Sequence, residues 1–186
     1  MAGSSDIAGT RVRARSRLRA GLCCCLALLA LAAAAALVPA SAGAEVPDAQ
    51  INPRNGKALA PKGAPSEVRR MIAAGNKIRR KKYVWGGGHA AGWKDKGYDC
   101  SGAVSYVLHA AGMLDYPLVS GDFKKWGEGG RGKWVSIFAN QGHVYMVVAG
   151  LRFDTSYITD GDKSGPGWST YMRESKGFTA RHPQGL

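Results

Sequence analysis

The stretch Gly97-Tyr98-Asp99-Cys100-Ser101-Gly102 decides how the rest of the chain is interpreted. Apolar residues follow it at helical spacing, which predicts a helix over residues 100–111 with Asp99 as its N-cap. A thiol at a helix N-terminus is a candidate nucleophile, because unpaired backbone N–H groups and the helix dipole favour the thiolate. Gly97 and Gly102 would leave room for a substrate backbone. A lone cysteine is equally typical of a buried core, so the downstream residues must distinguish the two interpretations.

Two strands predicted further along the chain supply partners for a nucleophilic cysteine. The apolar run 143–149 and the segment 151–154 are joined by a glycine, which predicts an antiparallel hairpin. Such pairing brings His143, at the start of one strand, close to Asp154 on the other. Together with Cys100 these residues supply the nucleophile, general base and orienting acid of a thiol acyl-transfer site.

Residues 1–44 have the pattern of a secretory signal peptide. A positive stretch at 11–19 precedes an apolar run at 21–38, and small residues at 42–44 offer a cleavage site. This pattern predicts export, and an uncleaved membrane anchor stays as the alternative because the run is near the length that spans a bilayer. Without the leader, Cys100 is the only cysteine, so we expect no intramolecular disulfide.

Composition places the chain among ordinary globular proteins with a basic surface. It has 186 residues, of which 45% are hydrophobic and 21% charged, enough for one domain with appendages. The formal net charge is +13, and a net +9 remains outside the leader. Such a charge suits a nucleic acid, an acidic membrane or an anionic wall polymer. We expect no nucleic-acid partner, because the aromatic residues do not interleave with the basic clusters.

The remaining segments predict a linker and one folded domain. Residues 45–65 contain four prolines and little hydrophobic pattern, which predicts a flexible linker before a domain over 66–186. The domain opens with a helix that Ser66 is expected to cap. This helix should end at the basic cluster 79–82, which is either a solvated helix end or a contact for an anionic polymer.

The residues around three consecutive glycines predict a strand and a loop. Bulky residues run into the glycines at 83–89, which is typical of a short strand ending in a closely approaching loop. His89 is expected to be a loop histidine, since no other ligand type stands at metal-binding spacing from it, and we expect no metal site. Further on, the pattern predicts a small helix around 123–126, an alternating strand at 133–139 and a closing edge strand near 178–183.

Three segments resemble the signature segments of the NlpC family of bacterial cell-wall cysteine peptidases, in the family's order and spacing. They are Tyr83-Val84-Trp85-Gly86-Gly87, Asp99-Cys100-Ser101-Gly102 and Gly142-His143-Val144. The resemblance covers about residues 66–183. It implies an α+β, papain-like NlpC-type fold, in which a nucleophile-bearing helix packs on a central antiparallel β-sheet. It also implies a secreted, extracytoplasmic protein of the cell wall whose partners are peptidoglycan stem peptides.

The resemblance assigns roles to individual residues. Cys100 would be the nucleophile and His143 its base. The third member is a polar residue on the next strand, often histidine in the family, and here that place falls to Asp154 or Thr155. Tyr83 would lie beside the nucleophile, where its hydroxyl would help the Cys100 backbone N–H to stabilise an oxyanion.

Three further residues would contact the substrate by the same resemblance. Asp99 and Ser101 would line the stem peptide, and Trp85 would belong to the same binding surface. Asp99 has two compatible roles, that of a helix cap and that of a partner for a free amine.

The activity implied is that of a cysteine endopeptidase. It would hydrolyse a stem-peptide bond, commonly that between D-glutamate and the following diamino acid, through an acyl-enzyme and without metal or cofactor. An N-acetylmuramoyl-L-alanine amidase and a catalytically inactive wall-binding protein are the alternatives. We expect a monomer whose only membrane contact is the leader, if it stays uncleaved. The bond that is cut and the physiological role stay open.

Overall fold

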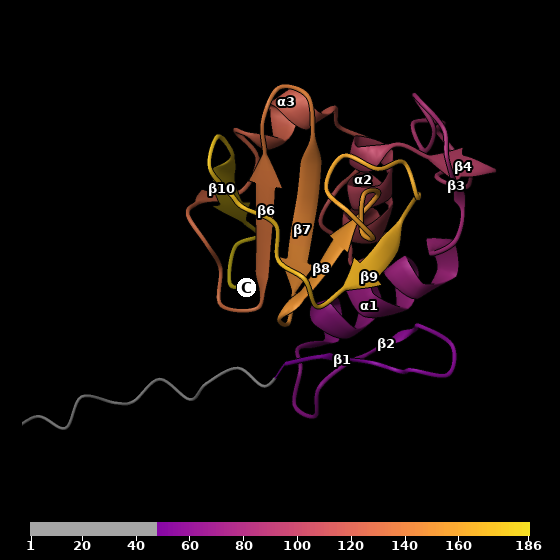
Figure 1. The fold of residues 1–186 in the computed structure, drawn as a ribbon. Helices are drawn as coiled ribbons and strands as arrows, with labels where there is room; N and C mark the ends of the chain where they lie inside the picture. The colour runs from indigo at the N-terminus through magenta and orange to yellow at the C-terminus, as the bar shows by residue number, and fades with distance from the viewer. Residues whose placement is uncertain (1–47) are drawn as a thin grey trace, which may run out of the picture. The chain divides into compact units, whose positions relative to one another are not determined.

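The computed structural model describes residues 48–186, and their central element is a six-stranded antiparallel β-sheet (Figure 1). In spatial order its strands are β5 (Glu128–Gly129), β10 (Thr179–His182), β6 (Val135–Ala139), β7 (Val144–Val148), β8 (Leu151–Asp154) and β9 (Gly167–Ser169). Helices α1 (Ser66–Ile78) and α2 (Cys100–Ala110) pack on each other and on one face of this sheet. The predicted α+β fold, with the cysteine-bearing helix on an antiparallel sheet, is confirmed.

A tight turn sets the register of the predicted hairpin. Strands β7 and β8 are joined by Ala149 and Gly150 alone, and both have positive φ, 44° and 79°. Two such residues in succession form the kind of turn whose twist matches that of paired strands. The resulting register pairs Met146 with Phe153. Asp154 therefore ends β8 near the start of β7.

Strand β6 is buried on both faces, so the expected alternation of buried and exposed residues is wrong for it. All five of its residues are buried. One face meets the helices, while residues 170–178 cross the other face (Figure 1). On that outer face the rings of Phe138 and Tyr145 stack with centroids 4.9 Å apart, and the Phe178 ring lies 5.3 Å from that of Tyr145.

Helix α1 packs tightly because it carries a glycine at its buried face. A Cβ at Gly75 would lie 2.5 Å from the Trp168 ring and 3.2 Å from that of Phe153. The helix begins at Ser66 as predicted, but Ser66 does not cap it. Pro65 occupies the N-cap position without a side-chain bond, and the Ser66 hydroxyl donates to Glu67 instead.

The segment before α1 is folded, which corrects the prediction of a flexible linker over 45–65. Within the described part of that range, β1 (Gln50–Ile51) and β2 (Ala58–Leu59) form an antiparallel hairpin. The Asn76 side chain accepts from the Ala58 N–H and donates to its carbonyl, both at 2.9 Å, and so joins the hairpin to α1. The prolines end the strands without preventing this local pairing.

Two other elements differ from their predicted places. The short helix α3 is Ser120–Phe123, rather than 123–126. Strand β10 is not an edge strand, since it lies between β5 and β6 and β9 forms an edge. Among residues 48–186 no helix is long and apolar enough to cross a membrane. The predicted leader at 1–44 lies outside the described residues.

Candidate active site

Cys100 is the first residue of α2, and Asp99 caps that helix as predicted. The Gly102 N–H donates to Asp99 Oδ1 at 2.7 Å. The strand β4 (Gly97–Tyr98) leads directly into the cap and pairs in parallel with β3 (Lys82–Tyr83). The thiol is thereby fixed at the end of a packed helix, with the residue 8% exposed.

The glycines around Cys100 serve packing rather than substrate access. A Cβ at Gly102 would collide with the carbonyl oxygen of Gly87, and one at Gly97 with the Val84 side chain. The glycine loop thus lies against the first turn of α2. The space expected for a substrate backbone at Gly97 and Gly102 is filled by the protein itself.

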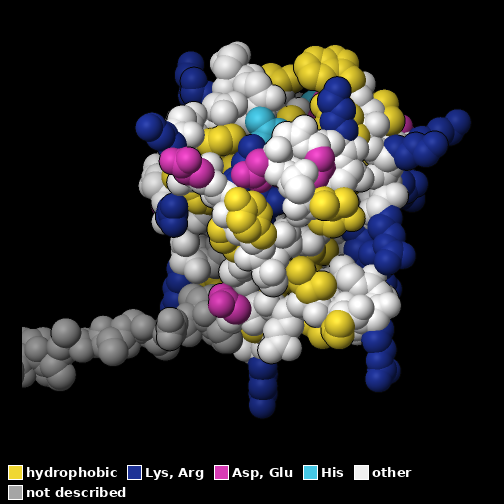
Figure 2. All heavy atoms as spheres, in the orientation of Figure 1, with side chains coloured by type: hydrophobic (Ala, Val, Ile, Leu, Met, Phe, Trp, Pro, Cys, Tyr) yellow, Lys and Arg dark blue, Asp and Glu magenta, His cyan; other side chains and the backbone are white. Residues whose placement is uncertain are grey.

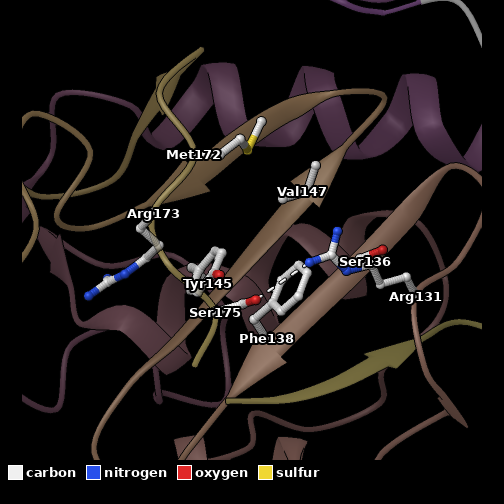
Figure 3. A pocket seen from close by; sticks show the side chains of 8 residues that line it. All are labelled: Arg131, Ser136, Phe138, Tyr145, Val147, Met172, Arg173 and Ser175. Atoms are coloured by element: carbon white, nitrogen blue, oxygen red, sulfur yellow. Dashed lines mark hydrogen bonds between the residues drawn. The ribbon is translucent and has the colours of Figure 1, made fainter. Parts of the chain in front are cut away.

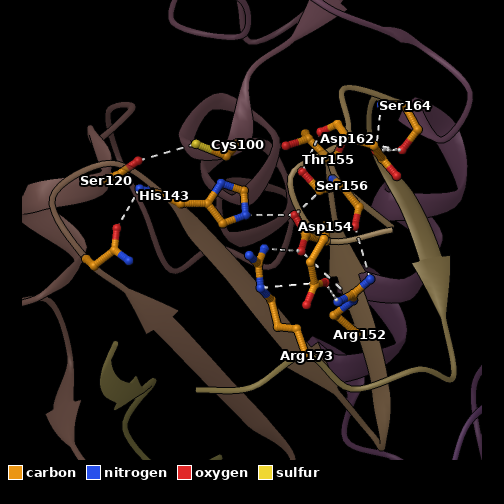
Figure 4. A network of polar contacts seen from close by, with 12 residues as sticks. Cys100, Ser120, His143, Arg152, Asp154, Thr155, Ser156, Asp162, Ser164 and Arg173 are labelled. Atoms are coloured by element: carbon orange, nitrogen blue, oxygen red, sulfur yellow. Dashed lines mark hydrogen bonds and ion pairs between the residues drawn. The ribbon is translucent and has the colours of Figure 1, made fainter. Parts of the chain in front are cut away.

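His143 faces Asp154 across the end of the β7–β8 hairpin (Figure 4). It directly precedes β7, and its backbone N–H donates to the Asn140 side chain at 2.8 Å, which fixes the loop. Its Nε2 lies 2.9 Å from Asp154 Oδ1. Because Nε2 is bound to the carboxylate, the other ring nitrogen is left for Cys100, toward which it points in Figure 4.

Asp154, and not Thr155, is the residue that holds the histidine. The Asp154 side chain is fully buried and also accepts from the Ser156 N–H at 3.0 Å and from Arg173 at 3.1 Å. Although burial works against ionisation, these contacts, that with His143 first, lower the pKa of Asp154. The Thr155 hydroxyl is buried and has no hydrogen-bond partner.

The electrostatics of the site favour a thiolate next to an imidazolium. Burial opposes both charges, but the hydrogen bonds to Asp154 and Cys100 raise the pKa of His143 to about 9. Against the same burial, hydrogen bonds from His143 and Ser120 and the charge of His143 lower the pKa of Cys100 below its usual 9.0. The thiolate is the reactive form of cysteine, so this shift prepares a nucleophile.

Ser120 contacts the nucleophile and is absent from the sequence-based site. Its Oγ lies 3.4 Å from Cys100 Sγ, and the residue is buried at the start of α3. A thiolate has no proton to give, so in the charged form the hydroxyl is the donor. No local motif marks Ser120, because its contact depends on how the loop after α2 returns to the helix.

A histidine expected to be a plain loop residue lies beside the predicted substrate-binding pair. His89 Nε2 is 3.1 Å from Asp99 Oδ1 and 3.2 Å from the Ser101 hydroxyl. Asp99 also accepts from the Gly86 N–H at 3.0 Å. Besides the helix-capping bond from the Gly102 N–H, the Asp99 carboxylate therefore has contacts to Gly86 and His89. No group of side chains suited to a metal ion occurs in residues 48–186.

The two aromatic residues of the predicted site, Tyr83 and Trp85, differ in how exposed they are. Tyr83 is half-buried near the nucleophile, and burial, with the charges of Cys100 and Asp99, raises the pKa of its phenol. The hydroxyl thus stays protonated and able to donate. Trp85 is 86% exposed, so it is available to a ligand but is not packed into the site.

Two cavities flank the His143–Asp154 pair. One, of about 240 Å³, is lined by His143. The other, of about 270 Å³, lies on the outer face of β6 and β7, between Phe138, Tyr145 and the crossing segment (Figure 3). Arg173 lines both cavities. Of the two, only the first includes a residue of the Cys100–His143–Asp154 group.

Comparisons with known proteins give structural likenesses only. The chain matches no protein-family profile and no curated protein sequence. It is similar to RipD from Mycobacterium tuberculosis, described as a non-catalytic NlpC/p60 domain protein adapted to peptidoglycan binding, with 20% identity over 63% of this chain and 98% of that chain and a TM-score of 0.45.

Two further solved structures show the same degree of likeness. One is a hypothetical invasion protein of Mycobacterium tuberculosis, with 21% identity over 62% of this chain and 61% of that chain. The other is a mutated form of the resuscitation-promoting-factor-interacting protein RipA, with 20% identity over 62% of each chain. Both TM-scores are 0.45. The chain spans about three fifths of the length of these two.

Proposed function

We propose that the protein is a cysteine hydrolase in which Cys100, His143 and Asp154 form a catalytic triad. The observation that carries this proposal is the chain of contacts from Asp154 through His143 to a thiol of lowered pKa at a helix N-terminus. A cysteine that only filled the core would need none of these partners.

The mechanism has two stages. The Cys100 thiolate attacks an amide carbonyl, the C–N bond breaks, and the amine leaves with the proton that His143 held at the nitrogen facing the sulfur. A thioester remains. His143, now neutral, takes a proton from water as the water attacks the thioester, which releases a carboxylic acid and restores the thiolate. Asp154 holds the imidazole in one orientation and stabilises its charged form.

Developing charge on the carbonyl oxygen needs donors that are already in place. The first backbone N–H groups of α2 are such donors, because a helix leaves them without intrahelical partners. The protonated hydroxyl of Tyr83 is the second candidate, and its half-buried position near Cys100 supports that role. We propose the Cys100 N–H and Tyr83 as the oxyanion-stabilising groups.

The substrate is proposed to be the peptidoglycan stem peptide. This assignment depends on the three segments that resemble the NlpC family, centred on Tyr83, Cys100 and His143. The same resemblance favours the bond between D-glutamate and the diamino acid. The leader pattern at residues 1–44 supports a secreted, extracytoplasmic location at the wall, and we propose a monomeric peptidase domain that includes the β1–β2 hairpin.

Asp99, Ser101 and Trp85 remain the proposed substrate contacts. Since Asp99 already contacts four groups of the protein, a substrate amine would have to replace or share the His89 contact. The exposed Trp85 offers an aromatic face for the rest of the peptide.

The test is digestion of purified peptidoglycan by the wild-type protein and by Cys100→Ala, with mass spectrometry of the released fragments. We expect the wild type to release peptide fragments and the variant to lose at least a thousandfold in rate, because no other group can form the thioester. The fragment masses separate cleavage within the stem from cleavage at the glycan–peptide amide. Equal activity of the two proteins would refute a thiol mechanism.

A wall-binding role is favoured by one separate observation, the basic surface. Lys and Arg side chains project around the face shown in Figure 2, and residues 80–82 of the basic cluster are exposed. If the protein binds the wall through this surface, the wild type and Cys100→Ala would both sediment with peptidoglycan at low salt. Both would be released as added salt screens the charges. Binding without cleavage by the wild type would favour the inactive alternative.

A further inference from the structure

A small cavity lies where the β1–β2 hairpin meets the end of α1. Its volume is about 120 Å³. Ile51 and Gly56 line it from the hairpin, and Arg79 and Arg80, the two residues that follow α1, line it from the other side. It shares no lining residue with the cavity that includes His143. A ligand bound here would therefore leave the triad accessible.

Arg79 brings to this cavity a buried donor that the protein does not use. Its Nε is buried and has no hydrogen-bond partner. Its guanidinium lies against the hairpin turn, since a Cβ at Gly56 would be 3.5 Å from Nη1. A guanidinium keeps its protons and can only donate. A buried donor without an acceptor costs stability, and a bound anion would supply the acceptor.

Arg80 is held in a backbone conformation that arginine rarely adopts. Its φ is 67°, and its N–H donates to the Pro166 carbonyl at 3.1 Å, which fixes the turn after α1. Glycine adopts this region without strain, whereas a residue with a Cβ does not. The chain nevertheless has a second arginine here, and this arginine also lines the cavity.

No carboxylate of residues 48–186 neutralises the two arginines. None lines the cavity, and none of the ion pairs within this part of the chain includes Arg79 or Arg80. Lys and Arg side chains gather at the side of the molecule where α1 ends (Figures 1 and 2). Four other exposed cations stand close to the cavity residues in the sequence, namely Arg54, Lys57, Lys81 and Lys82.

Two guanidinium groups suit a phosphate group better than a carboxylate. Each guanidinium has a planar fork of N–H donors, and one fork is enough for the two oxygens of a carboxylate. A phosphate group has oxygens for both forks. The cavity has room for such a group, because about 10–15 Å³ of this kind of volume holds one water molecule.

The surroundings of the cavity favour a phosphodiester polymer without bases. The exposed cations near the cavity would attract further phosphate groups of the same chain. A nucleic acid would need open aromatic faces on which its bases stack. Of the two aromatic residues that line the cavity, Trp168 is buried, and Tyr157 is half-buried against Gly167.

We propose that Arg79 and Arg80 form a phosphate-binding site, which attaches the protein to a phosphodiester polymer of the cell wall. The inference goes beyond the proposed function, because the site does not involve the triad; only its location at the wall rests on that function. Attachment would keep the protein close to its substrate without occupying the catalytic site.

Binding is measured by calorimetric titration of the whole protein with inorganic phosphate, poly(glycerol phosphate) and poly-D-glutamate of equal charge. We expect the phosphate polymer to bind at least about tenfold more tightly than either of the others, since it combines the site with the cations around it. Binding of inorganic phosphate alone would overturn the polymer as the ligand. Equal or tighter binding of poly-D-glutamate, or of a DNA oligonucleotide of equal charge, would overturn the assignment to a phosphodiester polymer without bases.

Variants locate the site. Arg79→Met and Arg80→Gly should each weaken the binding of inorganic phosphate and of poly(glycerol phosphate) about tenfold, the factor expected for a lost hydrogen bond to a charged group. The control is Lys133→Met, which removes one positive charge from an exposed position that does not line the cavity. It should leave both affinities close to those of the wild type. Equal losses in all three variants would mean that net charge alone binds the polymer, and would refute the site.

Thermal unfolding separates a binding role from a structural one. Neither variant should lower the unfolding midpoint of the protein without ligand, because Arg79→Met removes an unpaired donor and Arg80→Gly relieves a positive φ. Added phosphate should raise the midpoint of the wild type and not that of the variants. Lower midpoints together with unchanged phosphate binding would show that the two arginines serve folding, and would overturn the proposal.

The same titrations with Cys100→Ala keep this proposal apart from the hydrolase. Cys100→Ala should bind poly(glycerol phosphate) as the wild type does. Polymer binding by a wild type that cleaves no peptidoglycan would support the site and refute the hydrolase. Cleavage by a protein that binds neither phosphate probe would refute the site alone.

Discussion

Single residues around the sulfur determine when the thiol ionises. Ser120 contributes a hydroxyl 3.4 Å from Cys100 Sγ, and its hydrogen bond is one of the contacts that lower the pKa of the thiol. In Ser120→Ala we expect that pKa to rise, so the acid limb of the kcat/KM profile moves to higher pH. Below the new limb the rate should fall about tenfold, since a hydrogen bond to a charged group contributes roughly 1.5–3 kcal/mol.

The control for this prediction is Ser105→Ala. Ser105 lies on α2 with Cys100, is also buried, and accepts from the Leu118 N–H at 3.1 Å without a described contact to Cys100. Its loss should lower stability and leave the pH profile in place. A profile that moves equally in both variants would mean that Ser120 acts through packing.

The triad could be predicted from the sequence because each member has a local signal. Cys100 follows a cap residue, and His143 and Asp154 stand at corresponding places in a predicted hairpin. Ser120, His89 and Arg173 have no such signal. Their contacts bring together segments that are distant in the chain, so only the folded structure identifies them.

At the scale of elements, the contact between α1 and the sheet depends on the absence of a side chain at Gly75. An alanine there gains about 1 kcal/mol of helix propensity but meets the Trp168 ring, and overpacking costs roughly 1–3 kcal/mol. We expect Gly75→Ala to lower the free energy of unfolding by about 1–2 kcal/mol in urea denaturation. In a Trp168→Phe background, where the smaller ring lacks the contacting Cζ2 atom of the indole, the same substitution should cost less.

The elements that were predicted correctly are those with a periodic pattern. Helices α1 and α2 and the β7–β8 hairpin have apolar spacing or a tight turn that local sequence reveals. The β1–β2 hairpin has two-residue strands, too short for a pattern, and it is stabilised by Asn76 from a later helix. Burial of every residue of β6 likewise depends on residues 170–178, which return across it.

At the scale of the whole molecule, the lowered pKa of Cys100 and the raised pKa of His143 should have cancelling effects on how the free energy of unfolding depends on pH. An unfolded chain below about pH 8.5 keeps the thiol protonated, and above about 6.5 its histidine is neutral. In the folded site the proton is on His143 up to about pH 9 instead. Where Cys100 has ionised in the folded protein, the Cys100–His143 pair holds one proton in the folded and in the unfolded state. The free energy of unfolding should therefore not change with pH between these two pKa values of the unfolded chain.

Removing the thiol should expose the histidine contribution. In Cys100→Ala, Asp154 still favours the imidazolium, so the folded pKa of His143 stays above its unfolded value of 6.5. That contribution is complete below pH 6.5 and is lost as the pH rises through the folded pKa, with a slope of up to about 1.4 kcal/mol per pH unit. Urea denaturation from pH 6 to 9 measures both proteins. A wild type whose stability falls as steeply as that of the variant would contradict the paired shifts.

The segment that crosses the outer face of the sheet also determines when the site can form. Arg173, which pairs with Asp154, and β10, which pairs with β6, both follow every other element in the sequence. A ribosome therefore delivers the nucleophile, the base and the acid well before the cation that pairs with the acid and the strand that lies beside β6. A nascent chain therefore lacks the Arg173 contact to Asp154 and the β10 pairing of β6 until its last segment is released, so the full set of contacts around the site forms late in synthesis.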